Sequence, residues 1–209
     1  MSRTSHKLAS PFQNTRVLAE AKNALIAYAR LSDADLNAET GLNYRYLPCP
    51  DEDGDGLEET PCGSSSADGW LPWMTLGLPP LRDASSTCLR YFVASSYKQG
   101  GSTEPLIGDL PTAEFTLNSA EGIIATDVVA LVLAPGSVVL DQRRGVSPGI
   151  ATECGSTSSV SEANLAANYL ETTAGINNAS SPEFISSPLL IDSAGGFNDI
   201  VTAVLTSEL

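Results

Sequence analysis

The sequence has few of the residues from which catalytic and zinc centres are usually built. It contains one histidine, His6, and four cysteines that form no Cys-x-x-Cys pair. A Cys/His zinc site therefore cannot be completed, and a Ser-His-Asp triad would depend on a histidine in the polar N-terminal stretch. The GxSxG, P-loop and dinucleotide-binding motifs are absent as well. These absences predict a protein that is not an enzyme.

Basic residues and long apolar runs are also scarce. Lysine and arginine number 11 against 25 acidic residues, which gives a net charge of −14. Such a chain is repelled by phosphate backbones, so nucleic acid is excluded as an expected partner. No run approaches the roughly 20 apolar residues of a membrane-spanning helix, and the first 13 residues lack the apolar core of a signal peptide. The hydrophobic content of 42% nevertheless indicates a globular core.

The four cysteines, at 49, 62, 88 and 154, are even in number and widely spaced. This usage favours two disulfides and an oxidising compartment. Four cysteines allow three pairings, between which the sequence does not decide. We prefer Cys49–Cys62, because it would close the acidic segment between them, and Cys88–Cys154 then follows. Four reduced, buried thiols in a cytosolic protein are the alternative.

One strong helix is predicted near the N-terminus, after a disordered tail at residues 1–9. Ser10 is suited to the N-cap and Pro11 to the first helical position. Apolar residues then recur at three- and four-residue spacing, which predicts an amphipathic helix over residues 10–31. Its buried face would carry Leu18, Ala21, Leu25 and Tyr28.

The remainder of the chain is poor in helical patterns. Residues 32–87 are rich in loop-forming residues, and residues 88–209 contain strand-like runs at 88–97, 113–117 and 122–136. A short helix is expected at 161–171. Together these features predict a single α+β domain over residues 10–209. In it, an N-terminal α-helical spine packs on an antiparallel β-sheet with long disulfide-stapled loops outside.

The stretch LPCPDEDGDGLEETPC, at residues 47–62, has the spacing of half a calcium loop. A 12-residue calcium loop supplies oxygen ligands from positions 1, 3, 5, 7, 9 and 12, with glycine at position 6. Counting from Asp51, these positions hold Asp51, Asp53, Asp55, the carbonyl of Leu57 and Glu59, with Gly56 at position 6. The twelfth position, where a bidentate glutamate belongs, is Cys62. Glu58 and Asp68 are the candidates for this missing ligand.

A turn without metal is the alternative for this stretch. Aspartate side chains in turns accept hydrogen bonds from nearby backbone amides, and a 49–62 disulfide would stabilise the turn by about 3 kcal/mol with no ion bound. Pro48, Pro50 and Pro61 exclude the flanking helices of an EF-hand. If calcium binds, its expected role is folding and resistance to proteolysis rather than catalysis.

Several motifs together resemble those of type IV pilin-like proteins. They are the helix ending in AEAKNALIAYA, then LPCPDEDGDGLEETPCG, GWLPWMTLGLP and LRYFVA, followed by VVALVLAPG, ANYLE and FNDIVTAVLTSEL. The resemblance covers about residues 15–209. The combination of Leu47-Pro48-Cys49-Pro50, the Asp-Gly run, and Leu71-Pro72-Trp73 with Leu76-Gly77 is fairly specific, whereas any one of them alone would be weak.

The resemblance implies a structural subunit, a minor pilin or pseudopilin of a type IV pilus or type II secretion filament. Its partners would be other pilin or pseudopilin subunits and the inner membrane, reached through an N-terminal hydrophobic helix that this sequence lacks. The protein would lie on the periplasmic or extracellular face, anchored in the inner membrane before assembly. We therefore expect this chain to be the soluble piece of a longer protein. A secreted, calcium-stabilised ligand-binding or adhesive module is the alternative.

Overall fold

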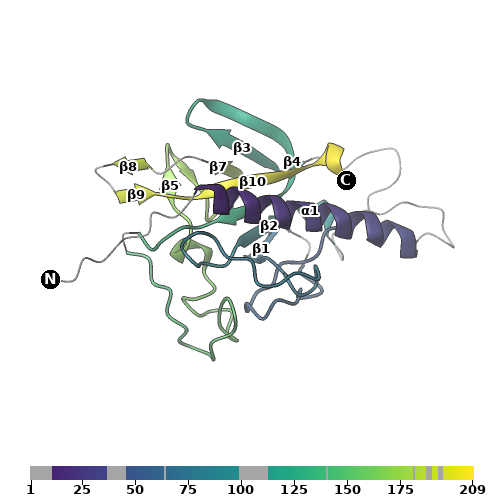
Figure 1. Ribbon diagram of the computed structural model, residues 1–209, viewed down its shortest axis with the longest axis horizontal. Coiled ribbons are helices and arrows are strands. Elements are labelled where there is room, and N and C mark those ends of the chain that lie inside the picture. The colour runs from purple at the N-terminus through teal and green to yellow at the C-terminus, as the bar shows by residue number, and fades with distance from the viewer. Residues whose placement is uncertain are drawn as a thin grey trace.

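The computed structural model describes residues 11–36, 46–63, 65–98, 113–139, 141–180, 182–186, 190–192 and 195–209. The predicted tail at 1–9 and the predicted cap Ser10 lie outside these residues. The described part contains one α-helix, α1 (Pro11–Leu36), and ten strands (Figure 1). The strands are β1 (Ala67–Trp70), β2 (Arg90–Val93), β3 (Phe115–Ser119), β4 (Gly122–Ala134), β5 (Thr172–Thr173), β6 (Ile176–Asn177), β7 (Glu183–Ile185), β8 (Leu190–Asp192), β9 (Gly195–Phe197) and β10 (Ile200–Leu205). Short 3-10 turns are η1 (Ser95–Tyr97), η2 (Ala166–Asn168) and η3 (Thr206–Glu208).

The main sheet is organised around β4, a strand of 13 residues. The order is β1-β2-β4-β3-β7, and β10 also pairs with β4. Strands β2, β3 and β10 run antiparallel to β4, whereas β7 joins β3 in parallel. Residues 128–134 of β4 are buried without alternation, which matches the continuous apolar run VVALVLA. The strand-like run predicted at residues 122–136 thus contains a single long strand.

The predicted fold class is wrong. The described structure is mostly β, and its curled main sheet is mixed because of the parallel β3–β7 pair, so it is not a helical spine packed on an antiparallel sheet. The segment 161–171, predicted as a helix, contains only η2. Its Asn164 donates side-chain hydrogen bonds to the carbonyls of Ser156 and Ser158, at 2.6 and 2.9 Å. Such contacts compete with helix formation.

Helix α1 lies alongside β10 and β4, and it extends five residues beyond its predicted end (Figure 1). Its buried side chains are Val17, Leu18, Ala21, Leu25 and Ala29, which join the one large hydrophobic core. Tyr28 is only partly buried. The Lys22 ammonium forms an ion pair with Glu208 at 2.7 Å, and Arg30 donates to the Glu208 carbonyl at 3.0 Å. The helix is therefore held both by the core and by the C-terminal turn.

Candidate metal centre

The acidic loop, residues 50–59, is held at both ends. Asp51 and Trp70 exchange two backbone hydrogen bonds of 2.7 and 3.1 Å, which places the start of the loop on the end of β1. The Glu59 amide donates to the Pro50 carbonyl at 3.3 Å and brings the end of the loop back to its start. The structure contains the disulfides Cys49–Cys62 and Cys88–Cys154. The first of these closes the chain just outside the loop.

Inside the loop, the aspartates accept hydrogen bonds from backbone amides that follow them. The two carboxylate oxygens of Asp51 accept from Gly54 and Gly56, at 2.5 and 2.7 Å. Asp53 accepts from the Asp55 amide at 3.1 Å, and Asp55 from the Leu57 amide at 2.8 Å. Each oxygen has a second lone pair, so these bonds leave the carboxylates able to bind a cation as well.

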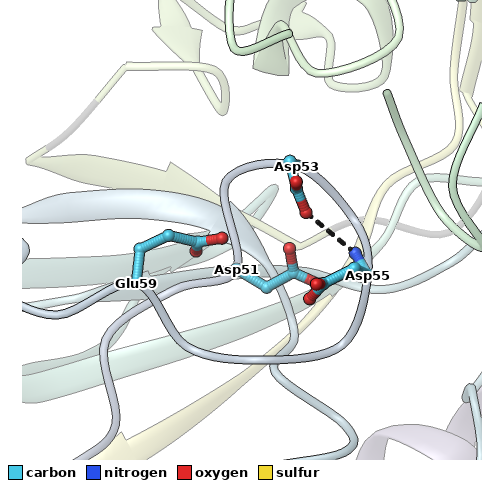
Figure 2. Close-up of side chains that lie close together, drawn as sticks. All are labelled: Asp51, Asp53, Asp55 and Glu59. Carbon is cyan, nitrogen blue, oxygen red and sulfur yellow. Dashed lines mark hydrogen bonds between the residues drawn. The ribbon is translucent and has the colours of Figure 1, made fainter. Parts of the chain in front are cut away.

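Four carboxylates converge within the loop, as Figure 2 shows. One oxygen from each of Asp51, Asp53, Asp55 and Glu59 can be chosen so that all four lie within 4.8 Å of one another. Oxygen ligands lie about 2.3–2.6 Å from calcium, so two on opposite sides of an ion are about 5 Å apart. Asp51 is buried, whereas Asp55 is exposed, so one side of the cluster is open to solvent. The cluster could therefore hold a metal ion.

Without an ion, burial shifts two acids of the cluster, Asp51 and Glu59, toward their neutral forms. Burial raises the pKa of Asp51 to about 6, opposed by the hydrogen bonds from Gly54 and Gly56 and reinforced by Asp55 and Asp53. Burial also raises the pKa of Glu59 to about 7, with the Glu52 amide acting in the opposite direction and Asp51 adding to the shift. A bound cation would favour the ionised forms of both groups.

Residues 152–155, which are distant in sequence, pack against the acidic loop. The Thr152 hydroxyl donates to the Asp53 carbonyl at 2.5 Å, and the Cys154 amide donates to the Gly54 carbonyl at 2.9 Å. Gly54 has a φ of +79° and lies so close to the Gly155 backbone that a side chain would overlap it. The segment 152–155 was not singled out from the sequence as part of this site. The disulfide partner Cys154 was its one visible signal.

The predicted ligands divide into two groups. The structure brings together Asp51, Asp53, Asp55 and Glu59. All four were predicted as ligands, at positions 1, 3, 5 and 9 of a calcium loop. The Leu57 carbonyl is not among these side-chain groups and stays a predicted ligand. Glu58 is outside this cluster, and its carboxylate accepts from the Tyr28 hydroxyl at 3.1 Å and from the Cys49 amide at 2.9 Å. Asp68 instead pairs with the fully buried Arg90 at 3.0 Å.

An open groove of about 390 Å³ lies beside the acidic loop. Glu52 and Asp68 contribute its acidic side, and Leu165, Ala166 and Ala179 are among its apolar lining. Asn164, which also lines it, is fully engaged with the Trp70 indole and the backbone of Ser156. The groove therefore combines a carboxylate edge with a small apolar wall.

No family model, no curated protein and no solved structure matches the chain. The resemblance to pilin-like proteins consequently depends on the sequence motifs alone. Among the described residues, no helix has both the length and the apolar character needed to cross a membrane.

Proposed function

We propose that the protein is a non-catalytic structural subunit, a minor pilin or pseudopilin of a type IV pilus or type II secretion filament, whose acidic loop binds calcium. One observation supports this assignment: several of the motifs behind the resemblance are joined to one another by hydrogen bonds and form one unit. The Tyr91 hydroxyl of LRYF donates to the Pro48 carbonyl of LPCP at 3.1 Å. The Asp-Gly run and the segment around Trp70 are joined through Asp51.

This unit also connects the helix to the loop. The Tyr28 hydroxyl of α1 donates to Glu58, immediately before the cluster residue Glu59. The two disulfides favour an oxidising, extracytoplasmic compartment, where calcium is available to a site of moderate affinity. An ion in the loop would thus stabilise the connection between α1 and the sheet, which is a structural role.

Calcium fits the cluster better than magnesium does. Calcium accepts six to eight oxygens in flexible geometry, whereas magnesium requires a near-ideal octahedron and usually keeps several waters. Four carboxylates, the Leu57 carbonyl and solvent from the open side would complete a calcium shell. The proposed ligands are therefore Asp51, Asp53, Asp55 and Glu59, with the Leu57 carbonyl as a fifth.

The calcium site is tested by thermal melting with and without millimolar calcium. Stabilisation should follow RT ln(1 + [L]/Kd), and Asp53→Ala should remove the response. Glu52→Ala is the matched control, because it deletes one carboxylate from the same loop but not from the cluster, and it should keep most of the response. If the melting temperature of the wild-type protein did not change at saturating calcium, the acidic loop would be a turn that binds no calcium.

The filament role needs a separate test in the host. Deleting the gene should reduce filament assembly or protein secretion, and a plasmid copy of the gene should restore it. Normal filaments and normal secretion in the deletion strain, with turnover of a soluble substrate by the purified protein, would overturn the proposal.

The groove favours a second candidate, a secreted ligand-binding or adhesive module. Leu165→Glu would place a charge in its apolar wall, and Leu165 is exposed enough for the protein to fold with this change. A structural subunit should still support filament assembly with this substitution. If the variant forms normal filaments but the cells lose adhesion, the binding module is favoured instead.

A further inference from the structure

Asp199 is a fully buried acid that lies between β9 and β10. Its Oδ2 accepts hydrogen bonds from the Glu171 amide at 3.0 Å and from the Asn178 side chain at 2.9 Å. Its Oδ1 is buried and has no hydrogen-bond donor within the described residues. An ionised oxygen buried in this way would lose its hydration without compensation.

The Glu171 amide that donates to Asp199 places the two acidic residues side by side, and their carboxyl groups interact electrostatically. Glu171 is itself 7% exposed. Its two oxygens accept from the Gln142 side chain at 2.7 Å and from the Asn198 amide at 3.1 Å. Two neighbouring carboxyl groups that are both buried cannot both be ionised at low cost. A proton between the two carboxyl groups would remove the repulsion between them and would give Oδ1 of Asp199 a hydrogen-bond partner.

No cation forms a direct ion pair with this pair of acids in the described structure. Arg144 is the nearby positive charge that interacts electrostatically with both acids. Tyr169 and Asp83 also interact electrostatically with Arg144. Its guanidinium donates to Asn168, Thr87, Gly136 and Gln142 and lies 4.5 Å from the centre of the Tyr169 ring. Arg144 therefore moderates the charge at a distance, and the proton remains necessary.

We propose that Asp199 is protonated at neutral pH and that its Oδ1 donates a hydrogen bond to the Glu171 carboxylate. This shared proton acts as a pH-sensitive latch between the start of β10 and the β5–β6 hairpin. Glu171 immediately precedes β5, and Asn178 follows β6. Asn178 also exchanges hydrogen bonds with Ile185 of β7, at 2.8 and 2.9 Å. Loss of the proton would therefore loosen the junction of four strands.

The direction of the pH effect follows from the environment. Burial raises the pKa of Asp199 well above its usual range, and the charge of Glu171 raises it further. A carboxyl whose pKa is higher in the folded than in the unfolded protein stabilises the fold most below its unfolded pKa. That contribution is lost as the pH rises through the folded pKa. The latch is thus closed in acid and opens toward alkaline pH.

The test compares the wild-type protein with Asp199→Asn from pH 5 to pH 9.5. The amide keeps one oxygen for Glu171 and Asn178 and offers an N–H to the Glu171 carboxylate, but it does not titrate. At pH 5 the two proteins should melt at similar temperatures. By pH 9.5 the wild type should have fallen by at least about 3 °C more than the variant for each unit by which the folded pKa of Asp199 exceeds 5. Asp141→Asn, at an exposed aspartate, should behave like the wild type.

A second measurement does not depend on folding of the variant. In protein labelled with carbon-13, the Asp199 carboxyl carbon, assigned through backbone connectivity, should show the chemical shift of a protonated acid at pH 7. A carboxylate shift at Asp199 from pH 5 to 8 would overturn the proposal. Parallel pH profiles of the wild type and Asp199→Asn would do the same.

Discussion

Gly56 lies against the indole ring of Trp73, so closely that a methyl group on Gly56 would overlap the ring. Gly56 also has a φ of +99°, a backbone conformation that favours glycine. The amides of Met74 and Thr75 donate to its carbonyl. The central glycine of the acidic loop therefore fixes that loop against the segment that follows β1.

Gly56→Ala should destabilise the protein for two reasons, backbone strain and overlap with Trp73. We expect a loss of about 3 kcal/mol in the free energy of unfolding. Gly77→Ala is the matched control, since Gly77 has a φ of +69° but open space around it. It should cost only about 1 kcal/mol. Urea denaturation measures both, and equal losses would show that Trp73 does not constrain the loop.

The two disulfides should contribute unequally to stability. They close segments with sequence separations of 13 and 66 residues. On the loop-entropy model, replacing Cys49 and Cys62 by alanine should cost about 3 kcal/mol, and replacing Cys88 and Cys154 about 4 kcal/mol. Guanidinium denaturation of the two double variants measures this difference. A larger loss from the shorter loop would contradict the entropic explanation.

Calcium stabilisation should depend strongly on pH. The pKa of Asp51 is raised to about 6 and that of Glu59 to about 7, so protons compete with calcium below neutral pH. In the calcium-free protein the stability that these protonated acids contribute is lost as the pH rises through 6 and 7. The increase in melting temperature on adding calcium should therefore be small at pH 5 and grow up to pH 8. If the increase in melting temperature stayed constant over this range, calcium would not be bound by Asp51 and Glu59.

The Tyr28–Glu58 hydrogen bond should couple α1 to the acidic loop. Burial, followed by the charge and hydrogen bond of Glu58, raises the pKa of Tyr28 to about 12, so the phenol stays neutral between pH 6 and 9. Tyr28→Phe should cost about 1 kcal/mol throughout that range. A double-mutant cycle with Glu58→Gln isolates the pair, and additive losses would mean that the two side chains do not interact in solution.

The candidate site was more predictable than the fold. Spacing alone identified Asp51, Asp53, Asp55 and Glu59, because a loop ligand set is encoded by residues close in sequence. The preferred disulfide pairs are both present, and the long apolar run of β4 is a strand. Local chemistry was sufficient for the acidic loop, for Cys49–Cys62 and for β4, whereas Cys88–Cys154 followed by elimination.

The fold class failed where long-range contacts decide the structure. The parallel pairing of β7 with β3 leaves no local pattern, since residues 116–118 pair with residues 183–185. Asn164 looked like a helical residue, but its side chain is used by the Ser156 and Ser158 backbone and the Trp70 indole. The Asp199–Glu171 contact was likewise invisible, because nothing near either residue in the sequence marks it as buried.

The contact between Thr152 and the Asp53 carbonyl joins residues 99 positions apart, and it imposes an order on maturation. Cys49 and Cys62 can find each other as soon as that short segment is exposed to an oxidant, because short loops close at low entropic cost. Cys88 must wait until residue 154 has emerged, and an early bond from Cys88 to either of the first two cysteines would trap the chain. The acidic loop would thus acquire its contacts with residues 152–155 late, after most of the chain has been made. A calcium ion that binds before residues 152–155 have packed against the loop would bind a site that is still open to solvent on that side.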